Sequence, residues 1–227
     1  MDQYIEYLEN FDPEYLYSVY KTVHEMMSDR NYAPNATVYN KSEFVSFYKG
    51  MLAEQMDSEL TPIELSDGLS LFFNKIDSEG PDTVMVYFFI FDVKIPQLFM
   101  EYILQKYRES DATHLIVIFN EKETQKIRNI NMLEGSEIFY MHELTFNVTK
   151  HVLVPKHTKI EDDERYNVIT QYATNSKGET DMSLIPGIGS SDPVVKYYNF
   201  KADDIIRIDR PRKDGYTDIY YRAVHDH

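Results

Sequence analysis

One run of nine residues narrows the folds open to this chain more than any other feature. Residues 83–91 read Thr-Val-Met-Val-Tyr-Phe-Phe-Ile-Phe, without the polar–apolar alternation of a strand that has one face in water. Such a run favours a central strand covered on both faces, and it is too short to cross a bilayer. Residues 115–119 form a second run of the same type. We therefore predict a buried sheet with helices packed against it.

Helix signals lie around these two runs. Asp12-Pro13 is a typical helix start, because Asp caps free N–H groups and Pro fits the first turn. Apolar residues then recur at helical spacing, and Asn31 suits a left-handed stop. Two further helices are predicted from Ser42 and from Pro96. The methionine and aromatic residues of the first two helices are assigned to the core, without a cofactor role.

The stretches between these elements give weaker signals. Residues 57–80 are mixed in composition and are predicted to be loop-like. Residues 138–140 and 146–148 are predicted to be two more short strands. The alternation of strands and helices predicts an α/β layered domain over about residues 10–145.

The net charge changes abruptly along the chain. Of the total of −15, residues 147–227 hold 12 Lys/Arg and 13 Asp/Glu, which leaves 11 basic and 25 acidic residues, a net −14, for residues 1–146. This step predicts two domains with a boundary near residue 146, and bare nucleic acid would repel the first. The absence of cysteine excludes disulfides and thiolate zinc sites. The N-terminus has no basic and apolar leader, so we expect an intracellular protein.

The C-terminal region is predicted to be a small α+β domain. Residues 151–157, His-Val-Leu-Val-Pro-Lys-His, are interpreted as a strand stopped by a proline bend, and an acidic helix follows. Residues 187–189, Gly-Ile-Gly, are interpreted as a turn. Asp192-Pro193 repeats the cap-plus-proline start of a helix.

A β-hairpin is predicted near the C-terminus. Residues 205–208 and 217–222 have strand composition, and Asp214-Gly215 marks the turn between them. The hairpin carries a basic cluster that is most simply a solvated face: Arg207, Arg210, Arg212 and Lys213.

One motif points to metal-dependent chemistry. Pro81-Asp82 with Asp92-Val93-Lys94 spells the PD-(D/E)xK pattern of nucleases, which place two carboxylates on one divalent ion. If residues 83–91 form one strand, Asp82 and Asp92 lie about 33 Å apart at ~3.3 Å per residue and cannot share a metal. The residues also show no nucleophile–base arrangement. We therefore expect no catalytic site, metal or cofactor.

The C-terminal third resembles one known family in several linked blocks. The pattern H-x-L-V-P-K-H is followed by an acidic helix, by L-P-x-I, by D-P-V-x-x-Y and by a basic hairpin that ends in Y-R. The family is the shared fifth-largest subunit of the eukaryotic nuclear RNA polymerases, whose C-terminal domain is equivalent to a small subunit of the archaeal RNA polymerase. The matching residues are His151, Leu153, Val154, Pro155, Lys156, His157, Asp192, Pro193, Val194, Tyr197, Ile205, Ile206, Ile208, Arg210, Gly215, Tyr221 and Arg222.

The resemblance weakens toward the N-terminus and departs from the family at two places. Residues 20–26 and 29–32 look like the family's first helix and the turn that ends it. At the hairpin entry, the family's usual glycine is Asp203, which can still occupy a left-handed turn. After the strand at 115–119, a proline-containing loop that lies near downstream DNA in the family becomes residues 120–126 without proline. This divergence and the acidity fit a large DNA virus homologue as well as a cellular one.

The resemblance implies a fold and a function. Residues 1–146 would be an acidic α/β jaw domain with restriction-endonuclease-like layers and no active site. Residues 147–227 would be an α+β assembly domain. The chain would be a non-catalytic subunit of a DNA-dependent RNA polymerase that docks on the largest subunit and holds the jaw near downstream DNA. It would work in the nucleus if cellular, or in a viral factory or virion if viral, without a membrane partner.

The resemblance also nominates site residues, and two other functions remain open. The expected partner-binding residues are His151, Leu153, Val154, Pro155, Lys156, His157, Asp192, Pro193, Tyr197, Arg207, Arg210 and Arg222. The expected DNA-proximal residues are Lys122, Lys126 and Arg128. The alternatives are a free-standing PD-(D/E)xK nuclease and a polymerase-docked adaptor whose jaw binds other proteins.

Overall fold

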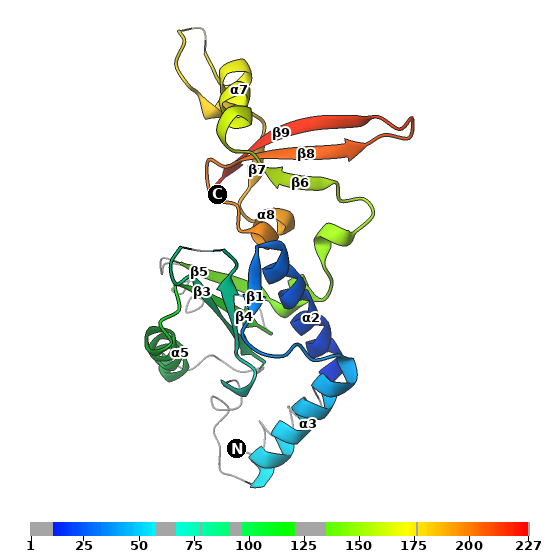
Figure 1. Ribbon diagram of the computed structural model, residues 1–227, viewed down its shortest axis with the longest axis vertical. Coiled ribbons are helices and arrows are strands. Elements are labelled where there is room, and N and C mark those ends of the chain that lie inside the picture. Colours follow the sequence, from blue (N-terminus) through cyan, green and yellow to red (C-terminus); the bar gives the residue numbers. More distant parts are fainter. Residues whose placement is uncertain are drawn as a thin grey trace. The chain divides into compact units, whose positions relative to one another are not determined.

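The chain folds into two compact units, Met1–Phe146 and Asn147–His227, and each unit has its own sheet. The computed structural model describes residues 11–57, 67–77, 79–90, 97–120, 135–175 and 177–226 (Figure 1). Among these residues, no helix is both long and apolar enough to span a membrane.

The first unit is built on a mixed five-stranded sheet of order β1-β2-β3-β4-β5. Its strands are β1 (Tyr32–Pro34), β2 (Leu71–Lys75), β3 (Thr83–Phe89), β4 (His114–Phe119) and β5 (Ser136–Tyr140). β3, β4 and β5 run parallel, whereas β1 and β2 are antiparallel to their neighbours. The two apolar runs are therefore adjacent central strands, and all but the first residue of each is buried. The prediction of an α/β domain with a buried sheet is confirmed.

Helices cover both faces of this sheet. They are α2 (Pro13–Asp29), α3 (Lys41–Asp57) and α5 (Gln97–Glu109), with a 3₁₀ turn η1 (Met141–Leu144) after β5. α2 begins where the sequence predicts, because Asp12 Oδ1 accepts a 2.8 Å hydrogen bond from the Glu14 N–H. α2 and α5 lie on opposite sides of the sheet in Figure 1. The His24 ring of α2 packs on Phe73 of β2, whereas Ser110, just after α5, contacts Met85 on the other face.

Two predictions for this part of the chain are wrong. Residues 57–80 are not all loop, because Leu71–Lys75 forms β2 and pairs antiparallel with β3. The strand predicted at 146–148 is a 3₁₀ turn, η2 (Val148–Lys150). Asn147 caps that turn by accepting a 2.9 Å hydrogen bond from the Thr149 N–H. Such a local cap competes with strand formation.

The second unit contains a four-stranded sheet of order β6-β8-β9-β7. Its strands are β6 (Lys156–Lys159), β7 (Gly187–Gly189), β8 (Ile205–Pro211) and β9 (Thr217–His225). Its helices are α7 (Asp162–Tyr172) and α8 (Pro193–Tyr198), with a 3₁₀ turn η3 (Met182–Leu184). The predicted hairpin, acidic helix and short helix are confirmed. So is the left-handed turn at Asp203, with φ 67°.

Two small cores lie on the two faces of this sheet. Ile205 and Ala223 pack with Val168 of α7 on one face. Ile206 and Val224 pack with Val195 of α8 on the other. Consecutive residues of one strand point to opposite faces, so the run Ile205-Ile206 serves both cores.

The second unit also contains two departures from the predictions. Residues 152–154 do not form a strand, and the strand β6 follows Pro155 instead of preceding it. Residues 187–189 are not a turn but the edge strand β7, parallel to β9. A Cβ at Gly187 would come within 2.5 Å of the His225 ring, so glycine permits this close approach.

Candidate partner-binding surface

Pro155 marks the point at which the edge strand β6 of the second unit's sheet begins. β6 pairs with β8 from Lys159 opposite Ile206 to Lys156 opposite Asp209. Pro155 precedes the strand and has no N–H with which to extend the ladder. β8 nevertheless continues to Pro211. The β6 side of β8 therefore carries no paired strand beyond Asp209 among the residues that the structure describes.

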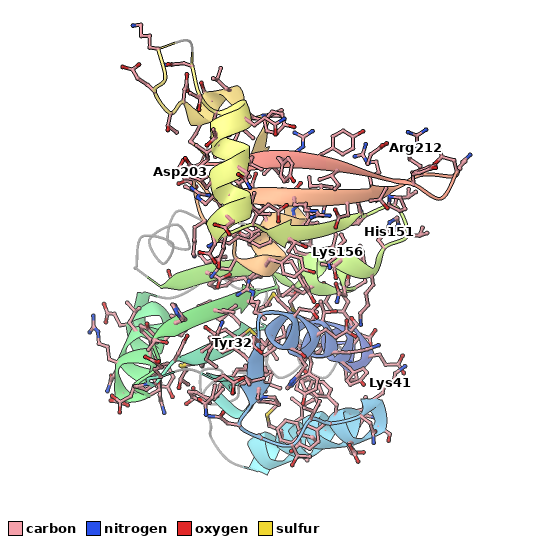
Figure 2. All side chains as sticks on the ribbon, turned by 45° about the horizontal axis from the view of Figure 1, so that its top comes forward. Tyr32, Lys41, His151, Lys156, Asp203 and Arg212 are labelled. Carbon is pink, nitrogen blue, oxygen red and sulfur yellow. The ribbon has the colours of Figure 1, made fainter. Side chains whose placement is uncertain are left out.

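The loop before β6 exposes two large apolar side chains. Val152 is 92% exposed and Leu153 is 82% exposed. The loop is ordered by its own hydrogen bonds: His151 Nδ1 accepts from the Leu153 N–H at 3.2 Å, and the His151 C=O accepts from the Val154 N–H at 2.9 Å. Because β6 is antiparallel to β8, this loop leads toward the outer end of the hairpin. Figure 2 labels His151 and Lys156 in this region and Arg212 near the hairpin turn.

The outer part of the hairpin extends past both cores. The Arg210 guanidinium lies over the Tyr220 ring at 5.2 Å, a cation–π contact. Ile219 and Tyr216 are also exposed. We call the loop residues Val152 and Leu153 together with Arg210 and Tyr220 of the hairpin the loop–hairpin surface. Large apolar side chains gathered on one exposed surface are typical of a protein contact.

The charged residues nominated from the sequence differ in their surroundings. Arg207 Nε donates to Asp209 at 2.7 Å, and its Nη1 lies 3.4 Å from Glu164 on α7. Arg222 Nη1 donates to the Gly187 C=O at 2.7 Å. Both side chains therefore already join elements of this unit. Lys156 and Arg210 are exposed and better placed to meet carboxylates of another chain.

The residues nominated in and around α8 make contacts inside the second unit. Asp192 caps the helix by accepting from the Val194 and Val195 N–H groups, and Pro193 occupies its first position. Tyr197 is 2% exposed, and its hydroxyl accepts a 2.8 Å hydrogen bond from Asn147 Nδ2. A buried tyrosine acts on a partner indirectly, by positioning what surrounds it. His157 is half-buried, with Nδ1 2.8 Å from the Pro155 C=O.

In the first unit, Asp82 is the one residue nominated for metal or DNA binding that lies within the described ranges. Asp82 accepts hydrogen bonds from the hydroxyls of Tyr32 and Thr113, at 3.1 and 3.0 Å. Its proposed metal partner Asp92 lies outside the described residues, and so do Lys122, Lys126 and Arg128. Within the described ranges, no three His, Asp or Glu side chains are grouped to hold a metal ion.

Sequence reasoning missed two parts of this surface. Val152 was not nominated, because it stands at the unspecified second position of the H-x-L-V-P-K-H pattern. Tyr220 was not nominated either, although Arg210 and Tyr220 lie diagonally on one face of a predicted hairpin and that pairing was available as a signal. The second unit thus combines an ordered loop that exposes apolar side chains with a strand edge that has no paired neighbour beyond Asp209 within the described part of the chain.

Comparison with known proteins identifies the family. The model described as RNA polymerase Rpb5, C-terminal domain, matches residues 146–224. The Pyrococcus abyssi protein named DNA-directed RNA polymerase subunit Rpo5 is 35% identical over 79 residues, which are 35% of this chain and 89% of that protein. This chain therefore belongs to the Rpb5 family of DNA-directed RNA polymerase subunits.

Longer relatives match both units. The Caenorhabditis briggsae protein named DNA-directed RNA polymerases I, II, and III subunit RPABC1 is 27% identical over 213 residues, covering 92% of this chain and 95% of its own length. The Acanthamoeba polyphaga mimivirus protein named DNA-directed RNA polymerase subunit 5 is 27% identical over 157 residues, covering 69% of this chain and 72% of its own. Cellular and viral proteins are thus both among the relatives.

Proposed function

We propose that this chain is a non-catalytic subunit of a multisubunit DNA-dependent RNA polymerase and that residues 147–227 dock on the largest subunit. The observation that carries the docking proposal is the exposure of Val152 and Leu153, at 92% and 82%, on an ordered loop. Burying each side chain against a partner would contribute about 1.5–3 kcal/mol. Leaving both in water serves no purpose within the unit itself.

The open edge of β8 indicates where a segment of the partner would bind. On its β6 side, β8 has no paired neighbour beyond Asp209 within the described ranges, so an extended partner segment can hydrogen-bond there as an added strand. Arg210 and Lys156 lie at the rim of this edge and would pair with acidic residues of that segment. Arg207 and Arg222 would keep the hairpin in shape through their bonds inside the unit.

The first unit has a different proposed role. Residues 1–146 would form the acidic jaw, with restriction-endonuclease-like layers, held near downstream DNA. A net charge of −14 opposes broad contact with phosphates, so DNA contact would be confined to Lys122, Lys126 and Arg128. Reversing these three charges should weaken crosslinking of the jaw to downstream DNA and leave assembly intact. Unchanged crosslinking would remove DNA contact from the proposal. The complex would act in the nucleus of a cell, or in a viral factory or virion.

The docking proposal is tested by co-expression with the largest polymerase subunit from the same source. Wild-type chain should co-elute with that subunit on size exclusion, and Leu153→Asp combined with Arg210→Glu should abolish co-elution. Leu184→Asp is the matched control, because Leu184 is an exposed leucine of the same unit outside the loop–hairpin surface. A folded wild-type chain that elutes alone would refute docking on this subunit. Equal loss in Leu184→Asp would refute the assigned surface.

A further inference from the structure

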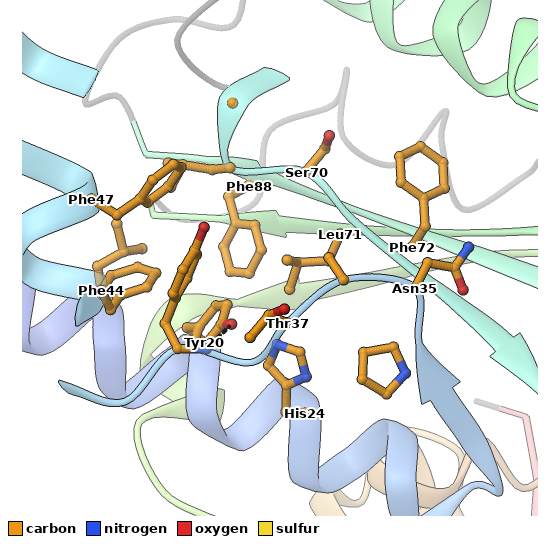
Figure 3. A pocket seen from close by; sticks show the side chains of 16 residues that line it. Tyr20, His24, Asn35, Thr37, Phe44, Phe47, Ser70, Leu71, Phe72 and Phe88 are labelled. Atoms are coloured by element: carbon orange, nitrogen blue, oxygen red, sulfur yellow. Dashed lines mark hydrogen bonds between the residues drawn. The ribbon is translucent and has the colours of Figure 1, made fainter. Parts of the chain in front are cut away.

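A cavity of about 610 Å³ lies inside the first unit. Figure 3 shows it between α2, α3 and β2, beneath the segment of residues 34–39 that joins β1 to α3. Six of the described residues that line it are Tyr or Phe, and two of the ring pairs are close: Tyr20 and Phe44 have centroids 4.7 Å apart, and Tyr39 and Phe47 are stacked at 5.2 Å. The sequence pattern assigned Tyr20, Phe44 and Phe47 to the core; Tyr20 and Phe44 are indeed buried, and all three also line this open space.

The segment over the cavity is fixed at both ends. The Asn35 N–H donates to the Phe72 C=O of β2 at 2.9 Å. The Tyr39 N–H donates to the Tyr20 hydroxyl of α2 at 3.1 Å. These bonds hold the segment in place over the cavity. Pre-formed pockets of about 300–1,000 Å³ with mostly apolar walls are the usual form of small-molecule sites.

A few polar groups stand among the rings. Asn35, Thr37 and Ser70 line the cavity, and so does His24, whose buried Nε2 has no hydrogen-bond partner among the described residues. Burial lowers the pKa of His24 to about 4, so its imidazole is neutral at pH 7. None of the described lining residues is Asp, Glu, Lys or Arg. A charged ligand would lose its hydration here without gaining a counter-charge from any of these described lining residues.

We propose that this cavity binds a small, uncharged, planar heteroaromatic molecule. Its rings would stack on the aromatic walls, and its polar edge would meet the amide of Asn35 and the neutral imidazole of His24. A volume of about 610 Å³ is large enough for a small free compound. The cavity lies in the unit that does not take part in the proposed docking, so ligand binding and docking are tested independently of each other.

The absence of tryptophan from the chain makes a direct test available. Indole-3-carboxamide, excited beyond the tyrosine absorption band, should show saturable binding to the full chain by fluorescence anisotropy, with a millimolar or lower Kd. Indole-3-carboxylate has the same rings with a negative charge and should bind at least about tenfold more weakly, because its charge must be desolvated. No saturable binding of the carboxamide, or equal binding of the carboxylate, would overturn the proposal.

Variants of single residues test whether the carboxamide binds in this cavity. Leu71→Phe places a larger side chain in the cavity and should weaken carboxamide binding at least about tenfold, while Ile76→Phe, an equivalent change just after β2 and outside the cavity, should leave it unchanged. His24→Phe keeps a ring but removes the polar nitrogen and should weaken binding severalfold. Thr37→Phe on the exposed segment replaces Leu71→Phe if that variant loses its far-UV circular dichroism spectrum. Equal affinities of the filled variant and Ile76→Phe would refute this site.

Discussion

Arg30 and Glu137, which are 107 residues apart in the chain, form a two-bonded ion pair that ties the end of α2 to β5. Arg30 Nη1 donates to Glu137 Oε1 at 2.9 Å, and Nη2 donates to Oε2 at 2.8 Å. The side chains are only 7% and 15% exposed. A planar guanidinium bonded through both nitrogens fixes orientation as well as distance. The pair therefore sets how the first helix lies on the last strand of the sheet.

Removing one partner of this pair should destabilise the first unit. Glu137→Gln leaves a guanidinium at a buried site without its carboxylate, and we expect a loss of about 2–4 kcal/mol. Hydrogen exchange read by mass spectrometry should show lost protection in α2 and β5, with β8 and β9 unchanged as an internal reference. Lys41→Met, in the exposed pair with Glu14, should have little effect on stability, because exposed ion pairs are screened by solvent. Equal effects of the two changes would show that burial does not strengthen the Arg30 pair.

Tyr197 should act through stability rather than through direct contact with a partner. Tyr197→Phe removes the hydroxyl that accepts from Asn147 inside the second unit, at a cost of about 1–2 kcal/mol. The affinity for the largest polymerase subunit should change little under conditions where the variant stays folded. Denaturant unfolding and a binding titration on the same preparation separate the two effects. A large affinity loss without a stability loss would make Tyr197 a contact residue.

His24 should make the stability of the first unit depend on pH. Burial lowers its pKa from 6.5 in the unfolded chain to about 4 in the folded chain. Above pH 6.5 both states are neutral, so there is no effect. As the pH falls from 6.5 toward 4, the unfolded state takes up the proton first and stability declines. Partial solvent access reduces the expected loss to about 1–2 kcal/mol.

His24→Phe is the control for that prediction, since it keeps a ring in the same place without a titrating group. Calorimetric melting between about pH 7 and pH 5 should show a smaller drop in the melting temperature for His24→Phe than for the wild type. Parallel pH profiles in the two proteins would assign the dependence to other groups.

Signals carried by single residues or by long apolar runs predicted much of the fold. The cap at Asp12, the left-handed residue Asn31 and the buried strand within residues 83–91 each follow from local chemistry, and each is confirmed. The prediction of a strand at Val152–Val154 is wrong because composition alone cannot distinguish a strand from a loop that exposes apolar side chains. Within the second unit these side chains have no core to fill, and Pro155 moves the strand to the residues that follow it.

Features that depend on contacts between distant parts of the chain could not be predicted from the sequence. The pairing of Arg30 with Glu137 depends on a fold that brings α2 to β5, and no spacing rule encodes it. The cavity could not be predicted for a similar reason. Helical periodicity shows which face of α2 turns inward, but it does not show whether the neighbouring elements fill the space. β7 was missed because three residues of Gly-Ile-Gly carry no strand signal of their own and pair only through β9.

The edge strand β7 leads to the last prediction. Gly187→Ala would place a Cβ within 2.5 Å of the His225 ring, which is half-buried at the end of β9. The ring must move, and we expect β7 to separate from β9 at a cost of about 1–3 kcal/mol. Amide exchange at Ala223, whose N–H donates to the Pro186 C=O just before β7, should accelerate, whereas exchange at Val224, whose N–H donates to the Asp204 C=O, should not. Gly50→Ala, in α3 with open space around it, should instead stabilise the chain by about 0.5–1 kcal/mol. Combining Gly187→Ala with His225→Ala removes the clash and should restore protection; if the double variant exchanges as fast as the single one, the His225 ring is not what requires glycine at this position.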